Sequence, residues 1–256
     1  MAKIEQRKKA LVRAYWWSKY DNFGDRLTAP ILDHFLDFEV KQSAVQDADI
    51  VGIGSVLEHL KEFYGFVVGT GKLHEDFDIR ANLDLGYCQI IGLRGYLSAK
   101  GLGDIPVGDL GLLADELVTV PTRDISLGIV PHWSDSKLAH DTRFIGNFSR
   151  LVIDVADDPL EVVRQIGRCE RIVTSSLHGA ITADAFGIPR RIEICENMIS
   201  DPNEGGVFKF RDYHSTCGLR FRPGLIQKPL YSKIVDRKNE IYDMLDYLKR
   251  LTCSIT

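Results

Sequence analysis

The sequence predicts an α/β protein made of two successive Rossmann-like βαβ domains and closed by a C-terminal amphipathic helix. Three observations support this fold class. Short apolar runs typical of strands alternate with helical patterns, a proline-containing polar segment divides the chain near its middle, and the last part carries apolar residues three or four positions apart. A chain of 256 residues with 45% hydrophobic content can fill one large core or two smaller ones, so we expect one or two domains.

The first domain is predicted to span residues 1–122. A basic lead-in reaches a strand over residues 11–16, and a helix over residues 27–38 follows it. Because strands that alternate with helices usually pair in parallel, the rest of this half should extend one parallel sheet. Its further strands are expected over residues 49–53, 65–68 and 89–93, with helices over residues 56–63 and 96–101.

The second domain is predicted to span residues 123–256. The junction is placed within residues 117–124, where proline and polar side chains precede a new apolar run. The same alternation then resumes, and a glycine and a proline stop the helix that follows the last expected strand. The strands are expected over residues 125–130, 151–154 and 171–174, and the helices over residues 159–169, 178–186 and, as the closing amphipathic helix, 235–251.

Charge and cysteine content argue against several classes of protein. A formal net charge of −4 gives no overall attraction for nucleic acid or anionic lipid, so an anion site must be built from a few local groups. The five cysteines form no CxxC pair, which favours a reducing cytoplasm and no metal site. The basic N-terminus lacks the cleavage site of a signal peptide, and no run approaches the roughly 20 apolar residues of a membrane span.

The most informative stretch is RIVTSSLHGAITADAFGIPR at residues 171–190, where a strand leads through two serines into a helix. A helix N-terminus offers unpaired amides and the positive end of the helix dipole, which suit a phosphate or a carboxylate. Ser175 and Ser176 could instead only cap the helix. His178, beside Gly179, can donate a proton near neutral pH once an anion favours its charged form, and a purely structural histidine is the alternative.

Glycine turns follow several of the expected strands in the first half. The motif DNFGDR places Asn22, Gly24 and Asp25 at the carboxyl edge of the sheet, where α/β folds bind ligands, although the same residue types also build ordinary turns. Gly54 in GIGS and Gly71 in GTG each follow an apolar strand. Neither turn forms a full GxGxxG or a Walker loop, so these motifs do not indicate a nucleotide site.

Three further side chains could contact an anion. Arg94 directly follows the strand QIIGL, and the planar fork of arginine suits phosphate and carboxylate oxygens. His132 ends the strand of GIVPHW, and Lys209 lies in GGVFKFRDY, which we expect to be a glycine-flanked loop whose cation closes over an anion. The alternatives are a surface ion pair for Arg94, a buried hydrogen-bonded ring for His132 and a solvated lysine.

Taken in order, several segments resemble the polysaccharide pyruvyltransferase family: DNFGD, GIGS, GTG, GLRG, GDLGLL, GIVPHW, TSSLHGAITADAFGIP and GVFKFRDY. The likeness runs from about residue 15 to about residue 213, and the Ser-Ser-Leu-His-Gly block is its most specific part. It implies two domains arranged as in GT-B glycosyltransferases, with phosphoenolpyruvate bound in the cleft and with no metal or other cofactor. The sequence departs from the family at Leu110, where GDLGLL replaces the usual Gly-Asp-Pro.

The resemblance implies an enzyme that moves pyruvate from phosphoenolpyruvate onto a sugar of a polysaccharide, or of its lipid-linked precursor, as a ketal. The first domain would then face the acceptor and the second the donor. For this reaction we assign His178 as the catalytic acid. The donor-binding residues would be Arg94, Ser175, Ser176, Gly179, Lys209 and His132, and the acceptor-side or turn residues would be Asn22, Gly24, Asp25, Gly54 and Gly71.

Two other classes of function stay open at this point. A GT-B-like glycosyltransferase that uses a nucleotide sugar would share the double βαβ layout, and a non-catalytic protein that binds an anion or a sugar would keep the pocket without turnover. We expect no nucleic-acid partner. A lipid-linked acceptor would bring the enzyme into peripheral contact with the cytoplasmic face of the inner membrane.

Overall fold

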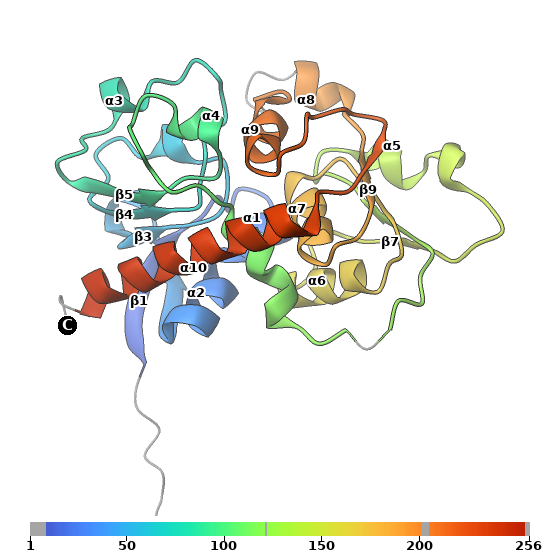
Figure 1. Ribbon diagram of the computed structural model, residues 1–256, viewed down its shortest axis with the longest axis horizontal. Helices are drawn as coiled ribbons and strands as arrows, with labels where there is room; N and C mark the ends of the chain where they lie inside the picture. The colour runs from blue at the N-terminus through green and yellow to red at the C-terminus, as the bar shows by residue number, and fades with distance from the viewer. Residues whose placement is uncertain (1–8, 121, 201–204, 254–256) are drawn as a thin grey trace, which may run out of the picture.

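The computed structural model describes residues 9–120, 122–200 and 205–253. The chain folds into two halves, each built on one five-stranded sheet with helices around it (Figure 1). The described strand pairs are parallel except for one antiparallel pair at the edge of the second sheet. The α/β class is therefore confirmed, and both sheets are consistent with Rossmann-like units. The predicted basic lead-in at residues 1–8 lies outside the described residues.

The first sheet has the strand order β2-β1-β3-β4-β5. The strand β1 lies near its middle, so the turn after β1 opens at the carboxyl edge beside the turn after β3. Four of the strands, β1, β3, β4 and β5, fall within or close to the predicted apolar runs. The strands are β1 (Ala10–Tyr15), β2 (Phe38–Gln42), β3 (Ile50–Val51), β4 (Gly65–Val68) and β5 (Cys88–Gly92).

Two helix predictions in the first half need correction. The helix predicted over residues 27–38 ends at Leu36, because Asp37 adopts a left-handed conformation with φ of 59°, and β2 begins directly after it. The helix predicted over residues 56–63 is wrong. A short 3-10 helix forms there instead, and Glu62, with φ of 61°, turns the chain toward β4.

The helical segments of the first half are therefore short, and α2 is the longest of them. They are α1 (Phe23–Arg26), α2 (Thr28–Leu36), η1 (Val45–Asp47), η2 (Leu57–His59), α3 (Ile79–Asn82) and α4 (Tyr96–Ala99). The 3-10 helix η3 (Leu110–Leu117) then leads to the second half. The predicted junction at residues 117–124 falls between η3 and the first strand of the second sheet.

The second sheet has the strand order β10-β9-β8-β6-β7. The strand β8 lies at its centre and leads directly into the helix that carries His178. We predicted β6, β7 and β8 but neither of the other two strands. The strands are β6 (Leu127–Val130), β7 (Arg150–Val152), β8 (Ile172–Thr174), β9 (Arg190–Ile192) and β10 (Ile226–Gln227).

The helices of the second half include the two predicted around β8 and one that contradicts a prediction. The segment expected to be a glycine-flanked loop around Lys209 is helical, because buried Phe208, Phe210 and Tyr213 give it an apolar face. The helical segments are α5 (Ser136–Ala139), η4 (Thr142–Phe144), α6 (Pro159–Gly167), α7 (Leu177–Ala185), α8 (Glu196–Ser200), α9 (Phe208–Thr216) and α10 (Tyr231–Cys253).

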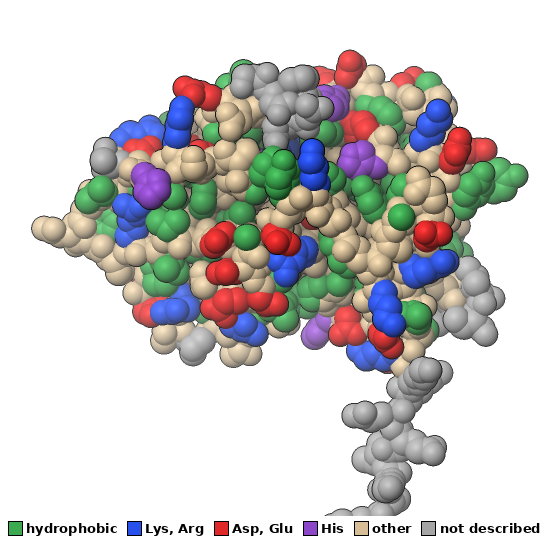
Figure 2. Space-filling view, turned by 180° about the vertical axis from the view of Figure 1, so that it is seen from behind, with side chains coloured by type: hydrophobic (Ala, Val, Ile, Leu, Met, Phe, Trp, Pro, Cys, Tyr) green, Lys and Arg blue, Asp and Glu red, His purple; other side chains and the backbone are tan. Residues whose placement is uncertain are grey.

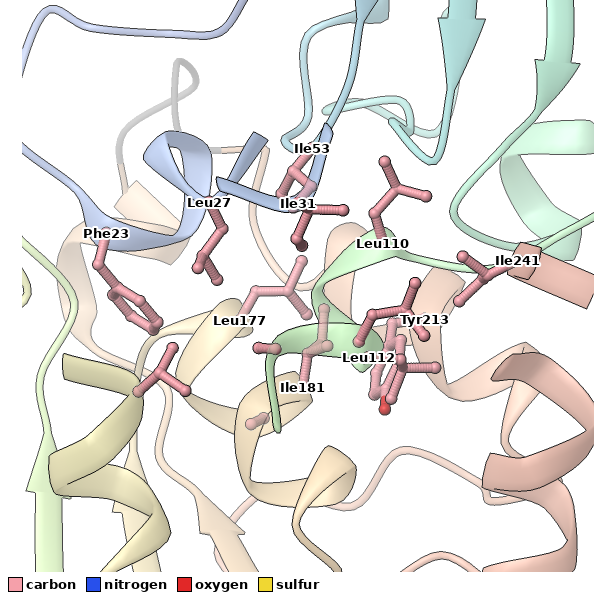
Figure 3. Packing of buried hydrophobic residues seen from close by; sticks show 14 of the residues in the cluster. Phe23, Leu27, Ile31, Ile53, Leu110, Leu112, Leu177, Ile181, Tyr213 and Ile241 are labelled. Carbon is pink, nitrogen blue, oxygen red and sulfur yellow. The ribbon is translucent and has the colours of Figure 1, made fainter. Parts of the chain in front are cut away.

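The two halves share one hydrophobic core. Buried residues of α1 and α2 pack through η3 onto α7, as Figure 3 shows for Leu27, Leu112 and Ile181. Burying a side chain of this size stabilises a fold by roughly 1.5 to 3 kcal/mol, so the shared layer ties the halves firmly together. The two sheets are therefore joined through a buried layer to which both halves contribute.

The last helix, α10, contains the residues for which an amphipathic helix was predicted. Its apolar face buries Ile241, Met244, Leu245 and Leu248. This face contacts α2, β4, β5 and η3, so a helix that follows the second sheet in sequence packs on the first half (Figure 1).

The surface agrees with the modest net charge. On the face seen in Figure 2, acidic and basic side chains are interspersed, and no continuous basic surface suited to nucleic acid covers that face. No helix of the described residues is long and apolar enough to cross a membrane. Cys88, Cys169 and Cys217 are buried free thiols.

Candidate active site

A cavity of about 510 Å³ lies between the two halves, where the carboxyl ends of strands from both sheets meet. Its walls come from the turns after β1, β3 and β4 in the first half and from the turns after β6 and β8, with α9, in the second. Ligands of α/β folds bind at this edge of the sheet, and the volume falls within the roughly 300 to 1,000 Å³ of small-molecule sites. Six of the predicted site residues line it: Asn22, Asp25, His132, Ser176, His178 and Lys209.

The first turn of α7 presents its amides to the cavity, but fewer of them than expected. Ser176 caps the helix through its Oγ, which accepts from the amide of Gly179 at 3.3 Å. The amides of Ser175 and Ser176 donate to acceptors inside the protein, so neither can bind a donor anion. The amides of Leu177 and His178 are the ones that the first turn leaves for a ligand.

His178 lies on the cavity floor and is only 5% exposed. Its Nε2 lies 3.7 Å from Oδ2 of Asp109, and both atoms are buried without a hydrogen-bond partner among the described residues. The other carboxylate oxygen of Asp109 accepts from the amide of Gly111 at 2.8 Å, which fixes the carboxylate. A small movement of the ring or a bound ligand would therefore complete a charged hydrogen bond at this position.

Gly24 determines how closely His178 can approach the first half. A Cβ atom at position 24 would lie 2.1 Å from Nδ1 of His178, so any other residue there would displace the ring. Gly24 therefore belongs to the site through its lack of a side chain, although it does not line the cavity.

Asp25 is a buried carboxylate on the first-half wall of the cavity. Burial raises its pKa, while the positive charges of His178 and Lys209 and a hydrogen bond from Asn22 oppose that rise. The Asn22 amide donates to Oδ2 of Asp25 at 2.7 Å. Gly54, with φ of 124°, leaves room for the other oxygen, because a Cβ there would lie 2.6 Å from Oδ1. Asn22 and Gly54 thus hold the carboxylate in place.

His132 faces the cavity from the end of β6. Its backbone amide donates to Oγ of Ser175 at 2.8 Å, and that hydroxyl donates to Asp135 at 2.6 Å. Ser175 is therefore a support for the β6 turn and does not line the cavity. Burial, with smaller contributions from the charges of Lys209 and His178, lowers the pKa of His132 to about 2. Its ring is neutral at ordinary pH and can form hydrogen bonds but cannot serve as the acid.

Arg94 is fully buried and does not line the cavity. Its Nε donates to Asp212 of α9 at 2.9 Å, its Nη2 donates to the carbonyl of Lys72 at 2.7 Å, and its Nη1 donates to Oγ of Ser55. Gly71 lies directly against the guanidinium. The structure thus places Arg94 behind the wall, where it positions Ser55, a residue that does line the cavity.

Lys209 reaches the cavity from the first turn of α9 and is only 8% exposed. The same helix carries Asp212, whose carboxylate accepts from Arg94 and from the amide and hydroxyl of Ser98. This buried ion pair fixes α9 against the first half. Lys209 is therefore a held cation and not a mobile one.

Sequence reasoning missed several residues that line or support the site. Asp109 stands in the GDLGLL segment and Trp133 in GIVPHW, but neither was singled out, and Trp17 and Tyr20 lie in none of the quoted motifs. Their position just after a strand's carboxyl end was the available signal. Within the described ranges, no group of three or more His, Cys, Asp or Glu side chains is arranged to hold a metal ion.

Comparisons with known proteins point to one family. A sequence model described as polysaccharide pyruvyl transferase matches residues 63–191, which include Arg94, Asp109, His132 and His178. The succinoglycan biosynthesis protein ExoV of Rhizobium meliloti is 28% identical over 229 residues, covering 82% of this chain and 66% of that protein. An uncharacterized protein of Acanthamoeba polyphaga mimivirus is 28% identical over 162 residues, covering 60% of this chain and 55% of the relative. The chain thus spans less than two thirds of the length of these relatives.

Proposed function

Because the chain belongs to the polysaccharide pyruvyl transferase family, we propose that it transfers a pyruvyl group from phosphoenolpyruvate to a sugar of a polysaccharide, or of its lipid-linked precursor, as a cyclic ketal. A role in exopolysaccharide biosynthesis is supported by the relative whose name refers to succinoglycan biosynthesis. The proposal includes a GT-B-like arrangement of the two halves and a cytoplasmic reaction that needs no metal or other cofactor.

One observation carries the chemistry of the proposal. His178 lies on the cavity floor in the first turn of α7, with the carboxylate of Asp109 on one side and Asp25 among the charges that face it. His178 is thereby equipped to act as a general acid.

The donor would bind on the second-half wall of the cavity. Its phosphate and carboxylate suit the two available amides of α7, the hydroxyl of Ser176 and the ammonium of Lys209. Neutral His132 would add a hydrogen bond. Ser55, held by Arg94, faces this group from the opposite wall.

The reaction begins with protonation of C3 of phosphoenolpyruvate by His178, which makes C2 an oxocarbenium-like electrophile. One hydroxyl of the acceptor attacks C2, and its proton passes to the carboxylate of Asp25, which faces the cavity. Phosphate then leaves C2 with the electrons of the C–O bond. A second hydroxyl attacks C2 and closes the ketal, and the protons released by the two hydroxyls return to His178 and to the phosphate.

The direct test is to incubate the protein with phosphoenolpyruvate and a panel of sugar acceptors, and to measure phosphate release together with the mass of the acceptor. We expect phosphate release only with a competent acceptor, and an acceptor product heavier by one pyruvate less one water. A nucleotide sugar offered in place of phosphoenolpyruvate should give no product.

Other outcomes would replace the proposal. Glycosyl transfer from the nucleotide sugar would identify a glycosyltransferase. Thermal stabilisation by phosphoenolpyruvate with no turnover on any acceptor would favour a non-catalytic anion-binding protein.

A further inference from the structure

Three aromatic side chains, Trp17, Tyr20 and Trp133, form a cluster in the wall of the cavity. Trp17 and Tyr20 lie in the turn between β1 and α1, and Trp133 follows β6, so the cluster joins the two halves. The rings of Tyr20 and Trp133 stack with centroids 4.1 Å apart and planes 16° apart. Trp17 is tilted against both, at 5.5 Å from Tyr20 and 5.8 Å from Trp133.

The aromatic cluster lies toward solvent, whereas the groups proposed to bind the donor lie deep. Tyr20 is 44% exposed, and Trp17 and Trp133 are half-buried. Ser176 and His178, by contrast, are 3% and 5% exposed. The cavity thus has a charged floor and an aromatic mouth, and a ligand as small as phosphoenolpyruvate would fill only part of its volume of about 510 Å³.

Leaving large aromatic faces partly in water is unfavourable by about 25 cal/mol for each Å² of apolar surface, so their position at a cavity mouth calls for an explanation. Aromatic rings pack well against a flat apolar surface and combine it with hydrogen bonding at their edges. Polar side chains line the same cavity, among them Lys19, Asn22, Glu58 and His59. A ligand with an apolar face and a polar rim would match this arrangement.

A pyranose ring has this character, because its axial C–H groups form an apolar face and its hydroxyls project from the rim. We propose that Trp17, Tyr20 and Trp133 form the acceptor subsite, on which a pyranose ring of the acceptor stacks while its hydroxyls reach toward Asp25 and His178. This inference rests on the proposed function for the identity of the site as an acceptor subsite. Binding of a pyranose by the cluster can be measured without the donor and without turnover.

The alternative is that the three rings only fasten the two halves to each other. Stacked aromatic pairs contribute stability beyond their buried area, so the cluster could be a structural contact. The two explanations differ in what a sugar does to the rings and in what the loss of a ring does to sugar binding.

The experiment is saturation-transfer NMR on the complete protein with methyl β-D-glucopyranoside and methyl β-D-galactopyranoside at millimolar concentration. Acyclic sorbitol, which has hydroxyls but no rigid apolar face, is the control ligand. We expect saturation of the pyranosides above the sorbitol level, strongest for the glucoside at the axial H1, H3 and H5, which share one face of its ring.

The variant Trp133→Leu keeps an apolar side chain but removes the ring, and it should weaken pyranoside binding about 10-fold. Trp133→Phe should retain part of the affinity, and Tyr20→Phe should retain most of it because the stacking face is kept. The matched control is Tyr64→Leu, which removes one ring of an exposed aromatic pair outside the cavity, with centroids 5.0 Å apart. This control should bind pyranosides as the wild type does.

Folding of each variant is checked by its thermal transition and by the shift that phosphoenolpyruvate produces. Pyranoside saturation no higher than that of sorbitol would overturn the inference, as would equal binding by the wild type and a folded Trp133→Leu. A lowered melting temperature with unchanged pyranoside binding would assign the cluster to the structural contact. If phosphoenolpyruvate failed to bind while the cluster still bound pyranosides, the donor in the proposed function would be wrong and the sugar subsite would stand.

Discussion

The two walls of the cavity carry buried groups of opposite character. The first-half wall contributes the buried carboxylate of Asp25, whereas the second-half wall contributes His132, His178, Lys209 and the first turn of α7. An anionic ligand is therefore favoured on the second-half wall and opposed near Asp25. The comparison indicates that the two walls of the cavity differ in charge before any substrate binds.

The largest expected effect concerns the acid on the second-half wall. His178→Gln should fold and retain much of its affinity for phosphoenolpyruvate, while turnover falls by about 10² to 10⁴, the usual contribution of a positioned proton donor. Turnover and donor binding are measured separately. His140→Gln, an exposed histidine outside the cavity, is the matched control and should behave as the wild type. Near-normal turnover in a folded His178→Gln protein would show that His178 is not the general acid.

The charge separation itself can be tested with one substitution on each wall. Lys209→Met should weaken phosphoenolpyruvate binding about 10- to 100-fold, because a charged contact to the donor is lost. Asp25→Asn should leave donor binding unchanged or make it tighter, since it removes a nearby negative charge, and should reduce turnover. Calorimetric titration with phosphoenolpyruvate measures both. Equal weakening of phosphoenolpyruvate binding by the two substitutions would mean that the two walls do not bind different substrates.

Arg94 offers a test of whether a residue behind the wall acts through position. Arg94→Lys should lose on the order of 1 to 3 kcal/mol of unfolding free energy without any ligand, because an ammonium cannot reproduce the fork that joins Asp212, Ser55 and Lys72. Donor affinity should fall as α9 and Lys209 shift. Asp212→Asn, measured by urea unfolding, should give the same pattern. A loss of donor affinity with full stability, seen only in Arg94→Lys, would indicate direct contact between Arg94 and the donor.

A smaller effect is expected from acid, through the depressed pKa of His132 on the second-half wall. In the unfolded chain His132 takes up a proton below about pH 6.5, whereas in the folded protein its pKa is only about 2. The free energy of unfolding that neutral His132 contributes is therefore fully present above pH 6.5 and falls as the pH drops below that value. The slope approaches about 1.4 kcal/mol per pH unit. His132→Gln should remove this part of the slope in urea unfolding measured between pH 7 and pH 5. An unchanged slope would show that His132 is not held neutral.

His214 provides the comparison for that experiment. It is a buried residue of α9 that does not line the cavity, and burial together with the charge of Arg190 lowers its pKa to about 3. His214→Gln should therefore remove a similar part of the slope, while only the His132 substitution should also alter donor binding.

The smallest expected effect is that of chelation. Because the proposed charge stabilisation uses Lys209, the α7 amides and His178, treatment with a chelator should leave turnover unchanged. Activity that disappears with chelator and returns with one divalent metal would contradict this. It would assign the charge stabilisation at the second-half wall to a bound metal ion.

The sequence predicted the parts of the fold that depend on local pattern. A few consecutive residues are enough to indicate the apolar strands β4, β6 and β8 and the capped helix α7. It did not predict β2, because the apolar run passes from helix to strand through Asp37 without a glycine or a proline. The strand β9 was not predicted, because it begins with two arginines and charged residues do not indicate a buried strand. In the folded chain Arg190 is buried in an ion pair with Asp184 at 3.0 Å.

The site was predictable to a similar extent. His178, Lys209 and Asp25, which line the cavity, were singled out because they stand in short segments rich in glycine, serine or charge. The buried ion pair of Arg94 could not be predicted from the sequence, because its partner Asp212 lies 118 positions away. The aromatic cluster was hidden for the same reason, since Tyr20 and Trp133 become neighbours only when two sheets meet.

The position of α10 has a consequence for the order in which the chain can fold during synthesis. Met244 and Ile241 fill the spaces left by Gly92 and Gly108, so the first half is covered by a helix that leaves the ribosome after both sheets. Until that helix arrives, the surface of β5 faces water without its apolar partner. A nascent chain with both sheets already emerged would therefore still lack part of the interior of its first half, and that interior is complete only when α10 has emerged as well.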